Sequence, residues 1–149
     1  MADSRIKQIM DQLVVQFRSI DRAGGYVNDI LLDQVGLGWM DFADAPGDRY
    51  PCIRLYEYDL GPSRWLDQQN HEDPWSVRVV AYAHVEEGGE DDLFTALLRL
   101  QSDLEAAVYS DGSLAGLVYE ISTHFEGTQL NDTYAGILFE ITGLTVIAV

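Results

Sequence analysis

The sequence predicts an α+β protein with a mainly antiparallel β-sheet and two principal helices packed on one face. Two stretches carry apolar residues at helical spacing, one near the N-terminus and one after residue 92. Four other stretches alternate apolar and polar side chains, as half-buried strands do, and they follow one another mostly in pairs. Because a single helix of crossover length lies between strands, we expect the strands to run mainly antiparallel and both helices to cover the same face.

The first element is an amphipathic helix near the N-terminus. Polar side chains fill one side of it, and its apolar side consists of Ile6, Ile9, Met10, Leu13, Val14, Phe17 and Ile20. Asp3 or Ser4 can cap its start, because either side chain can accept hydrogen bonds from the free backbone amides there. Gly24 and Gly25 supply the flexible backbone that ends it.

The following segment, residues 26–48, has a mixed pattern. We expect a short strand over Tyr26–Leu31 and then an irregular stretch, since the groups VGLGW and DAPGD contain residues that break regular structure. The first of these groups, Val35–Trp39, contains a GxG, but the third glycine and the βαβ context of a dinucleotide-binding loop are missing. It is therefore expected to be a turn.

Two strands are predicted in the middle of the chain. Pro51–Tyr58 alternates apolar and polar residues, and a proline at its first position loses no needed ladder hydrogen bond. Trp75–Val85 alternates most clearly, with Trp75, Val77, Val79, Ala81, Ala83 and Val85 on the core face and Ser76, Arg78, Tyr82 and His84 on the other. The polar segment between these strands, Leu60–Pro74, is expected to be a long exposed loop.

The second half of the chain predicts a helix and a closing pair of strands. Apolar residues recur at helical spacing from Leu93 to Val108, and the helix is expected to end near Gly112. The acidic residues Glu90, Asp91 and Asp92 favour its positive N-terminal dipole. Two apolar stretches, Leu117–Phe125 and Tyr134–Val149, are separated by EGTQLND and are expected to pair as antiparallel strands.

The composition indicates one globular domain. A length of 149 residues is enough to bury a single core, and the 47% of hydrophobic residues lies in the globular range. No repeat, low-complexity tract or linker divides the chain, so residues 1–149 are expected to form one domain. No apolar run reaches the about 18 residues that a transmembrane helix needs, and the N-terminus MADSRIKQIMDQ is too polar for a signal peptide. We therefore expect a cytoplasmic protein without a membrane partner.

The charge is strongly acidic, because 25 Asp and Glu against 9 Lys and Arg give a formal net charge of −16. Such a surface repels nucleic acid phosphates, which disfavours sequence-specific DNA binding. Solubility is one explanation for the charge, because acidic surfaces keep proteins apart. An acidic channel or a mimic of DNA is the functional alternative.

The sequence contains no GxSxG, Walker or HExxH motif. His71, His84 and His124 each have acidic neighbours but lack the spacing of established metal sites. Cys52 lies in an apolar stretch, where a buried thiol is the usual outcome. Asp91 and Asp92 fit a solvated helix N-terminus better than acid–base catalysis. The prediction is therefore a protein that is not an enzyme, with no catalytic, cofactor-binding or metal-binding residues and no cofactor.

Aromatic residues in irregular segments are the more informative feature. Trp39, Trp65 and Trp75 all fall in or beside such segments, where they either anchor an interface or fill the core from returning loops. The candidate interface residues are Trp65, Arg64, Trp39, Asp67 and His71. Four tyrosines are candidates for a stripe on the outer sheet face, facing a partner or a covering helix: Tyr50, Tyr56, Tyr58 and Tyr82.

This order of elements resembles that of the tail terminator, or tail completion, proteins of long-tailed bacteriophages and related contractile particles. The matching segments are the helix IKQIMDQLVVQFRSI, the segment GYVNDI, the strand start RYPCIRLYEYD, the long central strand, the second helix and the closing β-pair. The resemblance covers nearly the whole chain and is a similarity of order and texture. Its most characteristic part runs from GYVND to YPCI.

The resemblance implies a virion structural protein without enzymatic activity or cofactor. Proteins of that family form a hexameric ring on the last ring of the tail tube, stop tube polymerisation and present the head–tail joining surface. It implies the tail tube protein and the head–tail connector proteins as partners, DNA passing through the ring, and a place at the neck end of the tail after assembly in the host cytoplasm. Three alternatives remain: another neck or head-completion connector subunit, an acidic DNA-mimic inhibitor, and a small hydrolase whose site assembles from scattered residues.

Overall fold

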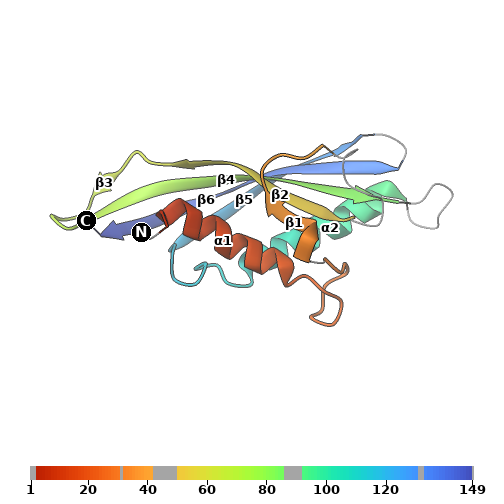
Figure 1. The fold of residues 1–149 in the computed structure, drawn as a ribbon, viewed down its shortest axis with the longest axis horizontal. Coiled ribbons are helices and arrows are strands. Elements are labelled where there is room, and N and C mark those ends of the chain that lie inside the picture. The colour runs from red at the N-terminus through yellow and green to blue at the C-terminus, as the bar shows by residue number, and fades with distance from the viewer. Residues whose placement is uncertain (1–2, 31, 42–49, 86–91, 131–132, 149) are drawn as a thin grey trace.

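A computed structural model describes residues 3–30, 32–41, 50–85, 92–130 and 133–148 of the chain (Figure 1). Its strands form one six-stranded sheet with the order β1-β2-β4-β6-β5, and β3 pairs with β4 outside this path. The strands are β1 (Val35–Leu37), β2 (Cys52–Leu60), β3 (Arg64–Trp65), β4 (Asn70–His84), β5 (Glu120–Gln129) and β6 (Tyr134–Ala148). Every pair is antiparallel except β1 with β2, which is parallel. The predicted α+β class with a mainly antiparallel sheet is therefore confirmed.

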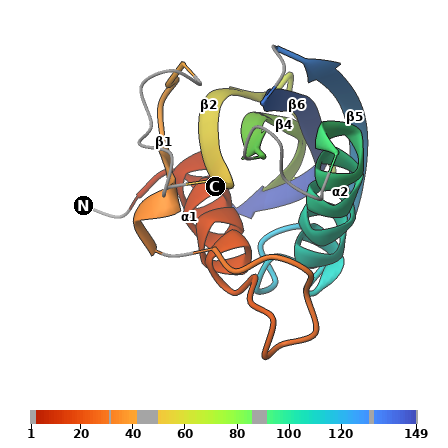
Figure 2. The same ribbon diagram turned by 90° about the vertical axis from the view of Figure 1, so that its right-hand side faces the viewer.

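Two helices cover one face of the sheet, as predicted. The first, α1 (Arg5–Arg18), begins after Ser4, whose side chain accepts a hydrogen bond from the Lys7 amide. The second, α2 (Leu93–Tyr109), begins after Asp92, whose carboxylate accepts from the Thr95 amide. Figure 2 shows the sheet curving around both helices, with α1 on the side of β1 and α2 on the side of β5.

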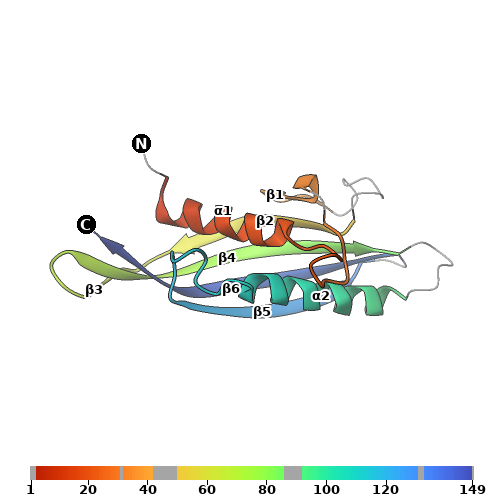
Figure 3. The same cartoon turned by 90° about the horizontal axis from the view of Figure 1, so that it is seen from below.

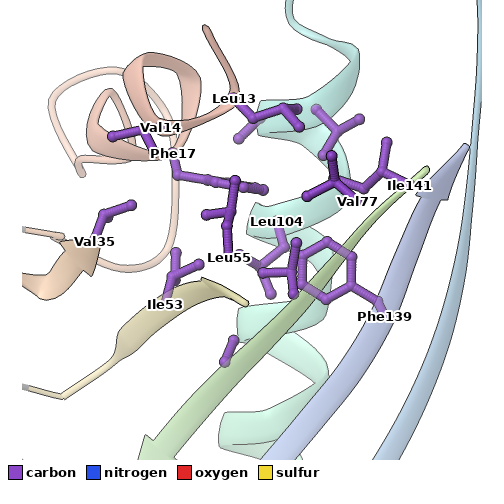
Figure 4. Packing of buried hydrophobic residues seen from close by; sticks show 14 of the residues in the cluster. Leu13, Val14, Phe17, Val35, Ile53, Leu55, Val77, Leu104, Phe139 and Ile141 are labelled. Carbon is purple, nitrogen blue, oxygen red and sulfur yellow. The ribbon is translucent and has the colours of Figure 1, made fainter. Parts of the chain in front are cut away.

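The main core lies between this inner sheet face and the two helices (Figure 4). It contains the alternating residues of β4 that the sequence predicted for the core face, from Trp75 to Ala83, all of them buried. Phe17 of α1 meets Phe139 of β6 edge to face, with ring centroids 6.1 Å apart. Side chains from both helices and from β1, β2, β4 and β6 thus share one apolar cluster.

A smaller cluster covers part of the outer sheet face. Cys52, Val80 and Tyr82 are buried there, and Met40, Tyr50 and Tyr56 pack against them. The predicted tyrosine stripe is therefore largely covered by the chain itself. Tyr58 is not part of it, because a β-bulge between Leu55 and Glu57 shifts the register and pairs Tyr58 with Val77, whose side chain faces the main core.

The segment after α1 differs from its prediction. No strand is found over residues 26–30, where the backbone amides of Val27 and Asn28 instead donate to the Asp103 carboxylate of α2. The VGLGW group is not a turn, because Val35–Leu37 pairs with β2 as β1 and follows the short 3-10 helix η1 (Leu32–Gln34). The Arg54 guanidinium stabilises this arrangement by donating to the carbonyl groups of Leu37 and Gly38. The DAPGD group lies outside the described residues.

The expected long loop from Leu60 to Pro74 is mostly a β-hairpin. Strand β2 continues to Leu60, β3 pairs with the start of β4, and β4 begins at Asn70. The early residues of β4 are paired with β6 from Asn70 onward, which explains why a polar stretch is extended. Figures 1 and 3 show this hairpin reaching beyond both helices, at the end of the sheet where α1 begins and β6 ends.

The predicted closing strands are found with shifted bounds. Residues 117–119 form a turn and bend, and β5 runs from Glu120 through most of the EGTQLND group to Gln129. Gly143 of β6 allows the closest approach of this pair: a Cβ there would overlap the Glu120 carbonyl and lie 2.9 Å from the Trp75 ring. A glycine is thus required where β5 crosses the buried tryptophan.

Candidate functional site

The candidate site is the tip of the β3–β4 hairpin, residues 64–71, which contains four of the five predicted interface residues. Trp65 pairs with His71 across the hairpin, and their ring centroids lie 5.3 Å apart in a T-shaped contact. Trp65 is nevertheless 60% exposed, and Leu66 beside it is also exposed. The tip thus presents an apolar surface supported from one side only.

Hydrogen bonds of Asp67 give the tip a defined shape. Its carboxylate accepts from the backbone amides of Gln69 at 2.7 Å and Asn70 at 2.8 Å, and also from the Asn70 side-chain amide. The bond with the Asn70 side chain, followed by that with the Gln69 amide, lowers the pKa of the Asp67 carboxyl. The turn is therefore held in one conformation before any partner arrives.

Two polar contacts fix the base of the tip. His71 Nδ1 lies 2.7 Å from a carboxylate oxygen of Asp73, which is buried. The Tyr119 hydroxyl donates to the Glu72 carboxylate, and chiefly this bond raises the pKa of Tyr119 to about 12. His71 and Glu72 are consecutive residues of β4 and therefore lie on opposite sides of it, and Trp65 lies on the side of its partner His71.

Trp39 does not join this group. It lies on the outer sheet face, where its ring contacts Tyr56 with centroids 4.8 Å apart and its indole nitrogen donates to Asp41. Its ring lines a groove of about 320 Å³ together with Val80, Tyr82, Leu130 and Leu138. Since Val80 and His71 are nine residues apart on β4, this groove lies roughly 30 Å from the tip.

Arg78 is the centre of a charged row beside the groove. Its guanidinium lies 3.3 Å from Glu140 of β6 and 3.6 Å from Glu57 of β2. Two carboxylates on the outer face are thus partly neutralised within the subunit. The net negative charge must be carried by other acidic residues.

The described residues contain no cluster of three or more His, Cys, Asp or Glu side chains arranged to hold a metal ion. Burial raises the pKa of the Cys52 thiol to about 11, so the thiolate needed for nucleophilic chemistry is disfavoured. Asp92 serves as the cap of α2. Glu90 and Asp91 lie outside the described residues.

Sequence reasoning missed two contributors to the tip, Tyr119 and Asp73. Tyr119 is distant in sequence and reaches the hairpin only because β5 and β4 flank β6. Asp73 lies two residues after His71 in the sequence, but its burial is seen only in the folded sheet. Trp75, one of the three tryptophans considered for an interface, is a buried residue of β4.

No protein-family model matches this chain, and no curated protein sequence matches it significantly. Among the described residues, no helix is long and apolar enough to cross a membrane.

Proposed function

We propose that this protein is a structural subunit of a phage tail terminator ring, which caps the tail tube, stops its polymerisation and forms the head-proximal joining surface. The observation that carries the proposal is the β3–β4 tip, which projects beyond the helices with Trp65 exposed on a pre-shaped turn. Tryptophan is enriched among the residues that carry most of the binding energy of protein interfaces. The resemblance to tail terminators in the order of elements supports the tail tube as the proposed partner of this tip.

The charge supports the same role. A net charge of −16 disfavours a grip on phosphates, as a ring through which DNA passes requires. The proposed partners are copies of this chain, the tail tube protein and the head–tail connector proteins. The proposed location is the neck end of the virion tail.

Substitution of Trp65 by alanine tests the proposal. If the ring caps the tube through the tip, Trp65→Ala should weaken binding to purified tail tubes by about 30-fold, since an interface anchor contributes about 2 kcal/mol. The melting temperature should stay nearly constant, because an exposed side chain contributes little to folding. Tyr58→Ala is the matched control, as Tyr58 is equally exposed but lies on β2 outside the tip.

Two results would count against the proposal. Unchanged tube binding by Trp65→Ala would remove the tip from the interface, and a large loss of stability would place Trp65 in the core. Wild-type protein that ignores tail tubes but binds the head connector would favour another neck or head-completion subunit.

The net charge favours a second candidate, an acidic inhibitor that imitates DNA. That function requires carboxylates along a duplex-like surface, whereas Glu57 and Glu140 on the outer face are both paired with Arg78. Competition between this protein and duplex DNA for a nucleic-acid-binding enzyme would establish the inhibitor, and the absence of competition would exclude it.

A further inference from the structure

We propose that neighbouring copies in the ring join through two different flanks of this protein, the α2–β5 flank of one copy against the α1–β1 flank of the next. This inference rests on the proposed function, because a closed ring of identical subunits needs a contact between two different patches. The α2–β5 flank consists of Phe94, Leu98, Glu105 and Tyr109. The α1–β1 flank consists of Val15, Arg18, Leu32 and Leu37.

The two flanks lie at opposite ends of the strand order. β1 and β5 are the terminal strands of the sheet path. Figure 2 shows β1 beside α1 on one side of the molecule and α2 beside β5 on the other. A contact between the flanks therefore extends the structure in one direction, from copy to copy.

The α2–β5 flank carries an apolar stripe that nothing in the described part of the chain covers. Phe94 and Leu98 are 68% and 51% exposed, and they lie one helical turn apart. Glu105 and Tyr109 continue the same side of the helix, given about 100° between successive residues. The Tyr109 hydroxyl lies 3.4 Å from the Thr123 hydroxyl, so this side of α2 borders β5.

Strand β5 adds an open edge to this flank. Within the described residues it pairs with β6 alone, and it is ten residues long. A long edge strand without lysine or proline is a natural site of contact with another protein chain.

The α1–β1 flank is also apolar and is held rigidly. Leu32 of η1 is 69% exposed, and Val15 of α1 and Leu37 of β1 are also exposed. The Arg18 guanidinium donates to the carbonyl oxygens of Leu32 and Val35, each at 3.1 Å, which joins α1, η1 and β1 into one surface.

One charged residue on each flank can pair with a charged residue on the other. Arg18 forms hydrogen bonds only with carbonyl groups and has no carboxylate within ion-pair distance among the described residues. Glu105 is exposed on the opposite flank, and no basic side chain in the described part of the chain forms an ion pair with it. A second copy of this chain supplies both missing charges together with apolar side chains, and this complementarity identifies the occupant of each flank as another subunit.

Two substitutions disable one flank each. Leu98→Glu places a charge in the α2–β5 stripe, and Leu32→Glu does the same on the α1–β1 flank. Tyr58→Glu is the control, because it adds the same charge at a position on β2 that is 61% exposed and belongs to neither flank. Light scattering after size-exclusion chromatography measures the mass, with tail tubes added if the wild type assembles only on them. Circular dichroism checks folding, and Phe94→Gln is a second α2–β5 variant if Leu98→Glu does not fold.

The wild type and Tyr58→Glu should form rings, whereas each flank variant alone should stay monomeric. An equal mixture of Leu98→Glu and Leu32→Glu should form pairs of two subunits and nothing larger, because one functional contact remains between the two variants. Rings that persist in either variant, or a mixture that forms no pairs, would overturn the flank assignment while leaving the proposed function standing. A wild type that forms no ring at any concentration or on tail tubes would overturn the proposed function itself.

Discussion

Gly143→Ala should be strongly destabilising, because the added methyl group has no space. Gly143 lies on β6 opposite Ile121 of β5 and Trp75 of β4. A Cβ at this position would overlap the carbonyl group of Glu120, which is backbone and cannot rotate away, and would press on the Trp75 ring at 2.9 Å. The first residues of β5 must therefore move away from β6.

The cost follows from two contributions. Overpacking against a well-packed neighbour costs about 1–3 kcal/mol. Separation of the strand ends weakens about two backbone hydrogen bonds at about 0.5–1.5 kcal/mol each. The free energy of unfolding should thus fall by about 2–6 kcal/mol, which lowers the melting temperature by at least about 4 °C for a chain of this size.

Urea denaturation followed by circular dichroism measures this loss. Gly112→Ala is the matched control, because a Cβ at Gly112 would meet only the Ile121 side chain at an ordinary 3.7 Å. The control should stay within about 0.5 kcal/mol of the wild type. If Gly143→Ala were as stable as Gly112→Ala, the close approach of β5 over Trp75 would be wrong.

Three further predictions concern the helices and the assembly. Asp103→Ala should lower the free energy of unfolding by about 2–4 kcal/mol in urea denaturation. The substitution removes a carboxylate that is only 4% exposed and leaves the amide groups of Val27 and Asn28 without their acceptor. An unchanged stability would contradict this anchoring role. The hydrogen bond from the Thr95 amide lowers the pKa of Asp92 below 3.8, so its contribution to stability is present above that pH and is lost as the pH falls through the lower folded-state pKa. Asp92→Asn keeps the cap without the titration, so acid denaturation curves should show the wild-type advantage disappearing below about pH 3.8, whereas a constant difference at all pH values would refute the linkage. Moderate salt should promote ring assembly, measured by light scattering, because it screens the repulsion between subunits that each have a net charge of −16. Dissociation of the rings by salt would instead show that ion pairs dominate the contacts.

The sequence predicted correctly those elements whose own pattern of apolar and polar side chains determines which face is buried. In β4 the residues from Trp75 to Ala83 alternate, and the alternation gave the core face before any partner strand was known. The two helices could be predicted in the same way, since Ser4 and Asp92 cap their starts through local hydrogen bonds. Such signals lie within a few consecutive residues.

The errors concern segments that depend on distant partners. Strand β1 contains a glycine among three residues, and it is a strand only because it pairs in parallel with β2 and receives hydrogen bonds from Arg54. The polar residues from Asn70 to Asp73 are extended because β6 lies beside them. At the candidate site the exposure of Trp65 matched the expectation from its polar surroundings, but the support by His71 could not be derived without the hairpin register.

The positions of the hairpin tip and of the two flanks allow a subunit to contact the tail tube and its neighbouring subunits at once. The tip lies at one end of the strands, so a partner bound there approaches along the strand direction (Figure 3). The proposed subunit contacts lie on the α1–β1 and α2–β5 flanks, which are separated along the strand order. Strand direction and strand order are perpendicular in a sheet, so a ring built through the flanks leaves every tip free to point the same way. Substitutions in the flanks and in the tip should therefore have separate effects. A flank variant should not form rings, whereas Trp65→Ala should form rings that no longer bind the tail tube.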